Sequence, residues 1–333
     1  MKTFLKACAA LSLAAATPAF AQAAAKTTDF PAATDKTKGK SIAYLPVAMG
    51  ITLTEIWWSQ IQKGAESAGM KALIRDPNWS SSAETQALTS LIAEKPTVIV
   101  VHNPNVQLLA KQLEKAQKEG IYVVQVNMVS KYKTDAYVGA DWDALGKQTA
   151  EAMVKDCGTG SGKSGKVAII QGELTSETSL GQMRAALPIL KADKGIKVVS
   201  SQAANWDATQ AHNVASTVLQ QNPDLCGIYG FWDTMTLGAS QAVKEAGLAG
   251  KVNVYTSGDG SKLACDSIAN GAFTQYYNYD AEAQGRAIIQ KAAELINSGK
   301  KPGSTHEMLF SPISVITKAN VASVKCPNFV MKK

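Results

Sequence analysis

The sequence predicts an α/β fold of two Rossmann-like lobes, each a parallel β-sheet covered by helices. From Ser41 onward, short apolar runs alternate with amphipathic stretches of helix length. This alternation occurs in two separate series, and the chain of 333 residues is longer than one hydrophobic core usually fills. Strands that alternate with helices of this length indicate parallel sheets with helices on both faces, so two series indicate two lobes.

The first series extends to Val126. Its expected strands span 42–47, 71–75, 97–101 and 121–126, and its expected helices span 53–68, 83–94 and 106–119. Residues 97–101 are nearly all Val or Ile, which is typical of a strand buried on both faces. Gly69 and Gly120 follow two of the helices, at the position where glycine often ends a helix.

The second series follows a long helix expected at 141–157. Its expected strands span 166–171, 197–201, 227–231, 252–257 and 272–276, and its expected helices span 179–192, 208–221, 234–246 and 262–270. A helix at 282–298 and a strand at 310–317 come last. These two final elements could return to the first lobe, which would give several chain crossings between the lobes.

The first residues predict export. Lys2 and Lys6 give a positive start, residues 7–16 form an apolar run, and residues 17–21 supply small side chains at an A-x-A cleavage site. This pattern is that of a secretory signal peptide, which we expect to span residues 1–21. The apolar run is too short to cross a bilayer as a mature helix. The alternative is a cytoplasmic protein with an alanine-rich start.

Residues 22–40, rich in Ala, Thr, Lys and Asp, are expected to form a flexible leader. No later segment approaches the length of a membrane span, so we expect a soluble mature protein outside the cytoplasm.

Charge and composition exclude several classes of function. The 34 Lys and Arg residues are scattered among 27 Asp and Glu residues, which indicates a solvated surface rather than a nucleic-acid interface. Arginine, the usual bidentate partner of phosphate and carboxylate, occurs only at Arg75, Arg184 and Arg286, which disfavours an anionic ligand. The sequence contains no CxxC pair, and its three histidines are far apart, so we expect no metal and no cofactor.

Four cysteines follow the predicted signal peptide, an even number that permits two disulfides in an exported chain. They allow three pairings, and spacing alone does not choose among them. Cys157 and Cys226 each precede a strand of the second series and could lie at one end of that sheet. We therefore predict a Cys157–Cys226 bond, which leaves Cys265 to pair with Cys326.

Polar residues recur where the expected strands end. Ligands of open parallel sheets bind beyond the carboxyl ends of the strands. The residues at these positions are His102, Asn103, Asn127, Gly172, Glu173, Trp232, Asp233 and Asp259. Each Asn or Asp alone could simply cap a helix. Their recurrence at one edge favours a binding site.

An ordered set of motifs resembles the type I periplasmic sugar-binding family, the group that contains ribose- and galactose-binding proteins. The motifs are Trp57-Trp58 followed by Gln62-Lys63-Gly64-Ala65, Gly120-Ile121-Tyr122-Val123-Val124, Gly139-Ala140-Asp141 followed by Leu145-Gly146, Asn205-Trp206-Asp207, Asp233-Thr234-Met235-Thr236-Leu237-Gly238, and Ser257-Gly258-Asp259-Gly260. The resemblance extends over roughly residues 41–317.

The resemblance implies two lobes joined by a three-crossover hinge, with crossings near residues 140, 280 and 310. The first lobe would comprise 41–140 plus 281–309, and the second 141–280 plus 310–333. The implied function is that of a periplasmic substrate-binding protein of an ABC importer. It would be a monomer that binds a small neutral sugar or polyol between its lobes and delivers it to a membrane permease.

The same resemblance implies the ligand-binding residues. These are Glu55, Trp57, Trp58, Asn127, Trp206, Trp232, Asp233, Asp259 and Tyr279. Indole rings would cover the C–H faces of a sugar, and carboxylate and amide oxygens would accept from its hydroxyls. Trp57 and Trp58 are adjacent on one helix and cannot share a face, so at least one of them could be structural. Met128 replaces an arginine of the family, and a ligand arginine near Leu180 is not matched.

Other functions remain open. Aromatic rings beside carboxylates, with Glu55 and Asp259 as the charges, could instead hold a small organic cation. A periplasmic enzyme is a further alternative, with His102 as its base. Residues 157–164 nearly match a phosphate-binding loop, but they follow a helix and precede a strand, the reverse of the order that such a loop needs. A repressor would need an N-terminal helix-turn-helix, but the predicted signal peptide occupies that position in the sequence.

Overall fold

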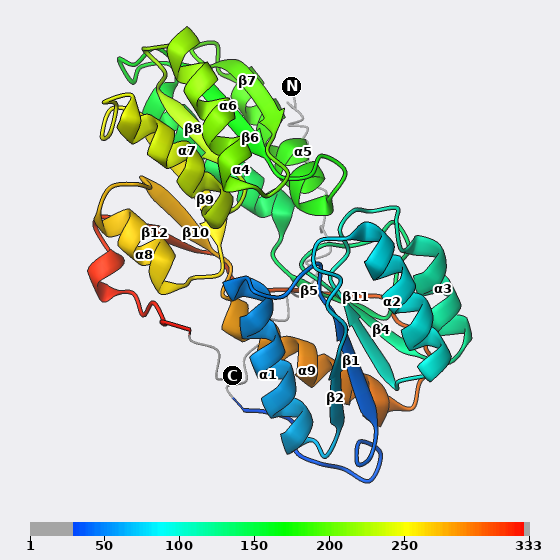
Figure 1. The fold of residues 1–333 in the computed structure, drawn as a ribbon. Coiled ribbons are helices and arrows are strands. Elements are labelled where there is room, and N and C mark those ends of the chain that lie inside the picture. Colours follow the sequence, from blue (N-terminus) through cyan, green and yellow to red (C-terminus); the bar gives the residue numbers. More distant parts are fainter. Residues whose placement is uncertain (1–28, 330–333) are drawn as a thin grey trace, which may run out of the picture.

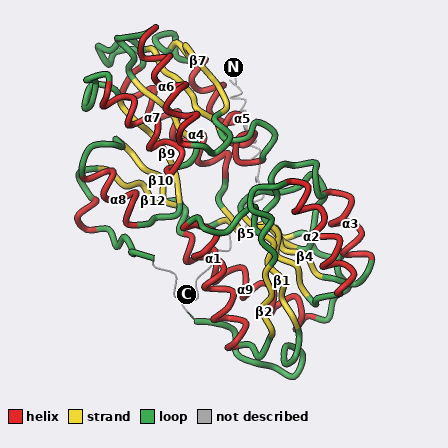
Figure 2. The backbone as a smooth tube through the Cα atoms, in the orientation of Figure 1, coloured by secondary structure: helices red, strands yellow, loops and turns green. Residues whose placement is uncertain are grey.

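The protein, described from a computed structural model over residues 29–329, contains two six-stranded sheets of matching order. The first sheet has the order β11-β5-β4-β3-β1-β2 and the second β12-β10-β9-β8-β6-β7. Each sheet carries helices on both faces, and the two units lie end to end (Figures 1 and 2). The arrangement confirms the predicted α/β fold of two parallel-sheet lobes. The first sheet with its helices is called the first lobe, and the second sheet with its helices the second lobe.

The first lobe is entirely parallel. Its strands are β1 (Ser41–Leu45), β2 (Lys71–Ile74), β3 (Val98–Val101), β4 (Tyr122–Val126), β5 (Ala136–Gly139) and β11 (Glu307–Phe310). Its helices are α1 (Thr52–Ser67), α2 (Ser81–Glu94), α3 (Ala110–Lys118) and α9 (Ala281–Ser298). Alternate residues of β3 enter separate cores: Val98 and Val100 pack with α1 and α9, and Ile99 and Val101 pack with α2 and α3. Burial on both faces explains the unbroken Val/Ile run.

The second lobe is parallel except for its edge strand β12, which pairs antiparallel with β10. Its strands are β6 (Lys166–Gln171), β7 (Lys197–Ala203), β8 (Gly227–Gly230), β9 (Asn253–Gly258), β10 (Gln275–Asn278) and β12 (Ser314–Thr317). Its helices are α4 (Trp142–Cys157), α5 (Glu177–Ala192), α6 (Ala208–Gln221), α7 (Asp233–Glu245) and α8 (Lys262–Ala269), followed by the short 3₁₀ helix η1 (Val321–Ser323).

The chain passes between the sheets in three places. These connections are β5 to α4, β10 to α9, and β11 to β12. The expectation of a single strand at 310–317 is wrong: β11 and β12 belong to different sheets, and Ser311-Pro312-Ile313 separates them. Proline lacks the N–H that a continuous strand would need at this point.

The predicted signal peptide, residues 1–21, lies outside the described residues. The expected leader is described from Asp29, and this part packs against the first lobe instead of extending freely. Thr37 is fully buried, the hydroxyl of Thr34 donates to Asn297 Oδ1 over 2.7 Å, and Lys36 Nζ donates to the Asn297 carbonyl oxygen over 2.7 Å. The side chains of Thr34 and Lys36 therefore attach this segment to the C-terminal end of α9.

Two disulfides lie in the second lobe and have the predicted pairing. Cys157 at the end of α4 bonds to Cys226 just before β8, and Cys265 of α8 bonds to Cys326. Within residues 29–329, no helix is long and apolar enough to cross a membrane. The same range contains no cluster of His, Cys, Asp and Glu side chains that could hold a metal ion.

Candidate functional site

Two adjoining cavities lie between the lobes, at the carboxyl ends of the strands. The inner cavity contains about 410 Å³ and the outer cavity about 1160 Å³ of empty space, and both volumes include space that is open to solvent. The inner cavity is lined by Val47, Ile51, Leu53, Trp79, His102, Asn127, Met128, Trp142, Thr178, Trp206, Phe231, Trp232 and Tyr279. The outer cavity is lined by Val47, Ile51, Trp79, Ser81, Glu84, Pro104, Met128, Glu173, Asn205, Trp206, Asp207, Ala208, Trp232 and Thr234. Both sets draw on both lobes, and their shared residues make the two cavities continuous.

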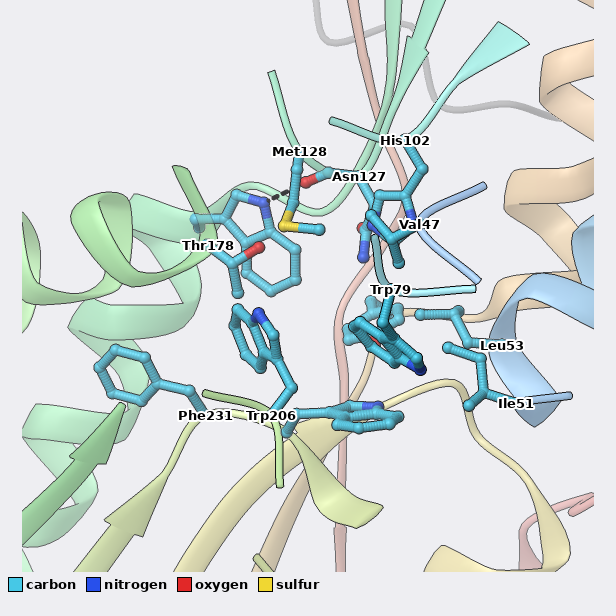
Figure 3. Close-up of a pocket in the computed structure, with 13 residues that line it drawn as sticks. Val47, Ile51, Leu53, Trp79, His102, Asn127, Met128, Thr178, Trp206 and Phe231 are labelled. Atoms are coloured by element: carbon cyan, nitrogen blue, oxygen red, sulfur yellow. Dashed lines mark hydrogen bonds between the residues drawn. The ribbon is translucent and has the colours of Figure 1, made fainter. Parts of the chain in front are cut away.

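Two matched turns bring one tryptophan from each lobe into this space. Asn78 and Trp79 follow β2 with φ values of 47° and 64°, and Asn205 and Trp206 follow β7 with 49° and 64°. β2 and β7 occupy the same edge position in their sheets. A polar helix cap comes next in each lobe: Ser80 accepts from Ala83 N–H, and Asp207 accepts from Gln210 N–H. Figure 3 shows Trp79 and Trp206 entering the same space from different directions.

Asn127 connects the cavity to one of the crossings between the lobes. It follows β4 with φ of 58°, a left-handed conformation that asparagine tolerates better than most residues. Its carbonyl oxygen accepts from Trp142 Nε1–H over 2.6 Å and from the Tyr137 hydroxyl over 3.1 Å. Trp142 begins α4 and meets Tyr279 edge to face, with ring centroids 5.6 Å apart. Trp142 therefore packs at the crossing and also lines the inner cavity.

His102 forms a buried polar wall at the end of β3. Burial lowers the pKa of His102 to about 3, so the imidazole is neutral at physiological pH. The ring meets Trp57 edge to face, with centroids 5.1 Å apart. A neutral imidazole on a tryptophan edge can donate or accept one hydrogen bond, but it cannot supply a positive charge.

Two polar atoms of residues that line the inner cavity lack partners within the described part of the chain. They are His102 Nδ1 and Trp232 Nε1, both fully buried. Buried polar groups in folded proteins are nearly always hydrogen-bonded. Two residues of the inner cavity therefore carry hydrogen-bonding capacity that the described part of the chain does not use.

Asp233 and Asp259 form a buried acidic pair behind the cavity. Burial, and secondly the charge of Asp259, raises the pKa of Asp233 well above its ordinary value. Burial likewise raises the pKa of Asp259. Asp233 accepts from the Tyr276 hydroxyl over 3.0 Å and from Thr234 N–H over 2.7 Å, and Asp259 accepts from Ser261 N–H over 2.9 Å. Neither carboxylate lines either cavity.

The structure brings together only part of the residue set predicted from the sequence. Asn127, Trp206, Trp232 and Tyr279 line the inner cavity. Glu55, Trp57 and Trp58 line neither cavity.

α1 turns Trp57 into the core of the first lobe. Its side chain is fully buried, and Nε1–H donates to Gln284 Oε1 of α9 over 3.1 Å. Trp58 instead stacks on Tyr44 of β1, with centroids 6.2 Å apart. Gly285 of α9 lies against Gln60 and the Trp57 backbone, where a Cβ would not fit. This close approach of the two helices fixes which face of α1 points inward.

Among the cavity-lining residues that the sequence analysis did not single out, Trp79 and Glu84 matter most for the chemistry of the cleft. A signal for Trp79 was present: the pair Asn-Trp occurs after the second strand of each series and before a helix-capping residue. No comparable repeat marks Glu84.

The chain matches known proteins over most of its length. A family profile described as a periplasmic binding protein domain matches residues 42–301. The D-allose-binding periplasmic protein of Escherichia coli (strain K12) is 28% identical over 263 residues, which are 75% of this chain and 83% of that protein. The ribose import binding protein RbsB of Bacillus subtilis (strain 168) is 27% identical over 250 residues, 74% of this chain and 77% of that protein.

Solved structures show the same architecture. An ABC transporter periplasmic solute binding protein from Actinobacillus succinogenes with bound D-allose has a TM-score of 0.74 and 25% identity, and the match covers 86% of this chain and all of the other. An ABC transporter solute binding protein from Mycobacterium smegmatis with bound glycerol has a TM-score of 0.78 and 23% identity, and the match covers 88% of this chain.

Proposed function

This chain belongs to the periplasmic binding protein domain family, and on that premise we propose that it is the solute-binding subunit of an ABC importer. Its solute is a sugar or polyol without an anionic group. The two relatives described above, a D-allose-binding protein and a ribose import binding protein, support a sugar or polyol as the class of solute. The chain has three arginines, and none of them lines either cavity, which disfavours an anionic solute.

The observation that carries the proposal is the composition of the inner cavity. Aromatic rings from both lobes line it, together with the unpartnered His102 Nδ1 and Trp232 Nε1. A polyol has apolar C–H faces that such rings cover and rim hydroxyls that can satisfy both buried atoms. An apolar cavity with a few directional polar groups is the usual chemistry of a small-molecule site.

Binding is coupled to closure of the lobes about the three crossings. The lobes comprise residues 41–140 with 281–309 and residues 141–280 with 310–333, and the crossings act as the hinge. The binding residues are those of the inner cavity together with Asp233 and Asp259. The closed form of the mature chain, a periplasmic monomer after removal of residues 1–21, is recognised by the permease. The site binds and releases its solute unchanged, so the chain is not an enzyme.

A screen of melting temperature with sugars and polyols, followed by calorimetry of those that bind, tests this function. A solute that binds only the folded chain raises its melting temperature. We expect at least one sugar or polyol to do so, and the Trp206→Ala variant to lose the response. If no sugar or polyol raises the melting temperature while a choline-type cation does, the solute class proposed here is wrong.

A further inference from the structure

Glu84 is a buried acid on the cleft, and no residue in the range 29–329 pairs with its carboxyl. It lies in the first turn of α2, is only 2% exposed, and lines the outer cavity. Its Oε1 is fully buried and has no hydrogen-bond partner in the described part of the chain. Burial raises the pKa of Glu84 to about 9. An unpaired carboxyl at such a site is costly unless it is neutral or a cation compensates its charge.

Within residues 29–329, the cleft offers no lysine or arginine among its lining residues for this purpose. Neither cavity is lined by Lys or Arg, whereas Glu173 and Asp207 line the outer cavity from the second lobe. Asp76 lies at the turn that carries Trp79, where its Oδ1 accepts from Asn78 N–H over 2.8 Å. Asp233 and Asp259 lie behind the wall of the second lobe. The fixed charges around the cleft are therefore acidic.

Indole rings complete the environment that a cation would meet. Trp79, Trp206 and Trp232 line the same outer cavity as Glu84. The face of an indole ring attracts a cation, by about 0.5–2 kcal/mol according to how far the cation is removed from water. A buried carboxyl and several indoles on one cavity are complementary to a small organic cation with a polar body.

We propose that the solute carries a protonated amino group, which Glu84 receives in the outer cavity while the polyol body occupies the inner cavity. This inference rests on the proposed function and narrows its class of solute to amino sugars and amino polyols. A neutral sugar would leave Glu84 as a protonated acid that donates one hydrogen bond.

The two kinds of solute predict different pH dependences. An ammonium group favours the ionised carboxylate, so binding of an amine near neutral pH releases the proton of Glu84. Below the pKa of Glu84, the affinity then rises about tenfold per pH unit, or about 30-fold between pH 5.5 and 7. A neutral solute that accepts from the protonated acid shows no such rise. Other acids near the cleft could also contribute to the pH dependence of the affinity; these are Glu173, Asp207, Asp76, Asp233 and Asp259. A Glu84 variant isolates the part of the pH dependence that is due to Glu84.

Calorimetry with matched pairs of probes tests the inference on the mature chain. The amines are D-glucosamine, D-galactosamine and glucamine, and their uncharged parents are D-glucose, D-galactose and sorbitol. We expect at least one amine to bind ten times or more tightly than its parent at pH 7. Its affinity should rise about tenfold per pH unit, as argued above. Its binding should also release a proton, which calorimetry in buffers of different ionisation enthalpy measures. Glu84→Gln keeps the shape of the side chain and should abolish both the preference and the slope. Glu94→Gln, at the exposed far end of α2, is the matched control and should change neither.

The outcomes separate the two proposals. If every parent binds as tightly as its amine, the inference fails and the proposed function stands. If no probe of any pair binds, the inference fails together with the assignment of a sugar or polyol. A preference for the amine that persists in both Glu84→Gln and Glu84→Ala would remove Glu84 from the site and overturn the inference. Melting of each variant without solute shows that it is folded.

Discussion

The indole of Trp206 lies directly on the backbone of Gly172, so that a Cβ at position 172 would overlap its six-membered ring. Gly172 immediately follows β6, and Trp206 belongs to the turn after the neighbouring strand β7. The glycine thus positions the ring in the cavity, because any other residue would push the indole away from this wall.

Gly172→Ala should weaken solute binding by about tenfold or more, since the methyl group displaces the indole from the cavity. Titration calorimetry measures the effect. In a Trp206→Ala background, the added Gly172→Ala change should have almost no further effect, because coupled neighbours are not additive. Equal losses in both backgrounds would show that Gly172 acts independently of Trp206.

Trp79→Ala should weaken solute binding by about ten- to hundredfold, which corresponds to about 1.4–2.7 kcal/mol. Its indole is 49% exposed, so the unfolding free energy without solute should change by less than about 0.5 kcal/mol. Solute titration and urea denaturation measure the two quantities. Leu263→Ala, which removes a side chain 45% exposed on α8, should change neither quantity appreciably. If the Trp79 variant bound the solute with unchanged affinity, Trp79 would not contribute to binding, and only the other aromatic rings of the cleft would contact the solute.

Asp259→Asn should stabilise the chain without solute more at pH 7.5 than at pH 4.5. Burial raises the pKa of Asp259 in the folded chain, so between its ordinary and its folded pKa the unfolded chain loses the proton first. The unfolding free energy of the native protein therefore falls as the pH rises through this window. The amide removes that loss and the charge repulsion with Asp233, so the gain in unfolding free energy is larger at pH 7.5 than at pH 4.5.

Urea denaturation at both pH values measures this effect. Asp266→Asn, which changes an exposed partner of Lys262, is the control and should show no comparable pH-dependent gain. Equal stabilisation at the two pH values would contradict the assignment of a raised pKa to Asp259. Under the proposed function, Asp259→Asn also weakens solute binding by about tenfold, or about 1.4 kcal/mol.

Replacing Cys157 and Cys226 together by Ser should lower the unfolding free energy by about 2–4 kcal/mol. Their bond closes a sequence separation of 69 residues and joins α4 to the start of β8, at the opposite end of the sheet from the cleft. Solute affinity should therefore stay within about threefold of the native value, a change below about 0.7 kcal/mol. A large loss of affinity with little loss of stability would contradict the prediction that this bond stabilises the fold and does not affect solute binding.

The alternation of strands and helices was predictable because burial on both faces of a sheet requires nearly continuous apolar runs, as at β3 and β4. β5 was not predicted, since its four residues carry too short a pattern to distinguish it from a loop. The division of 310–317 into β11 and β12 depends on which sheet each half joins. Only the packed structure decides this pairing.

The site was predictable where it depends on the ends of strands. Asn127, Trp232 and Tyr279 each follow a strand directly or by one residue, so the topology alone places them at the cleft. Trp57 was misplaced because the orientation of α1 is set by its contact with Gly285 of α9, more than two hundred residues later in the sequence. Glu84 was missed because only the folded structure shows that its carboxyl is buried without a partner.

The first lobe is completed late along the chain. Its sheet needs β11 as an edge strand, and α1 is covered by α9, yet all the α-helices and most of the strands of the second lobe are encoded between β5 and α9. A ribosome must therefore synthesise most of the polypeptide before the N-terminal half can close its core.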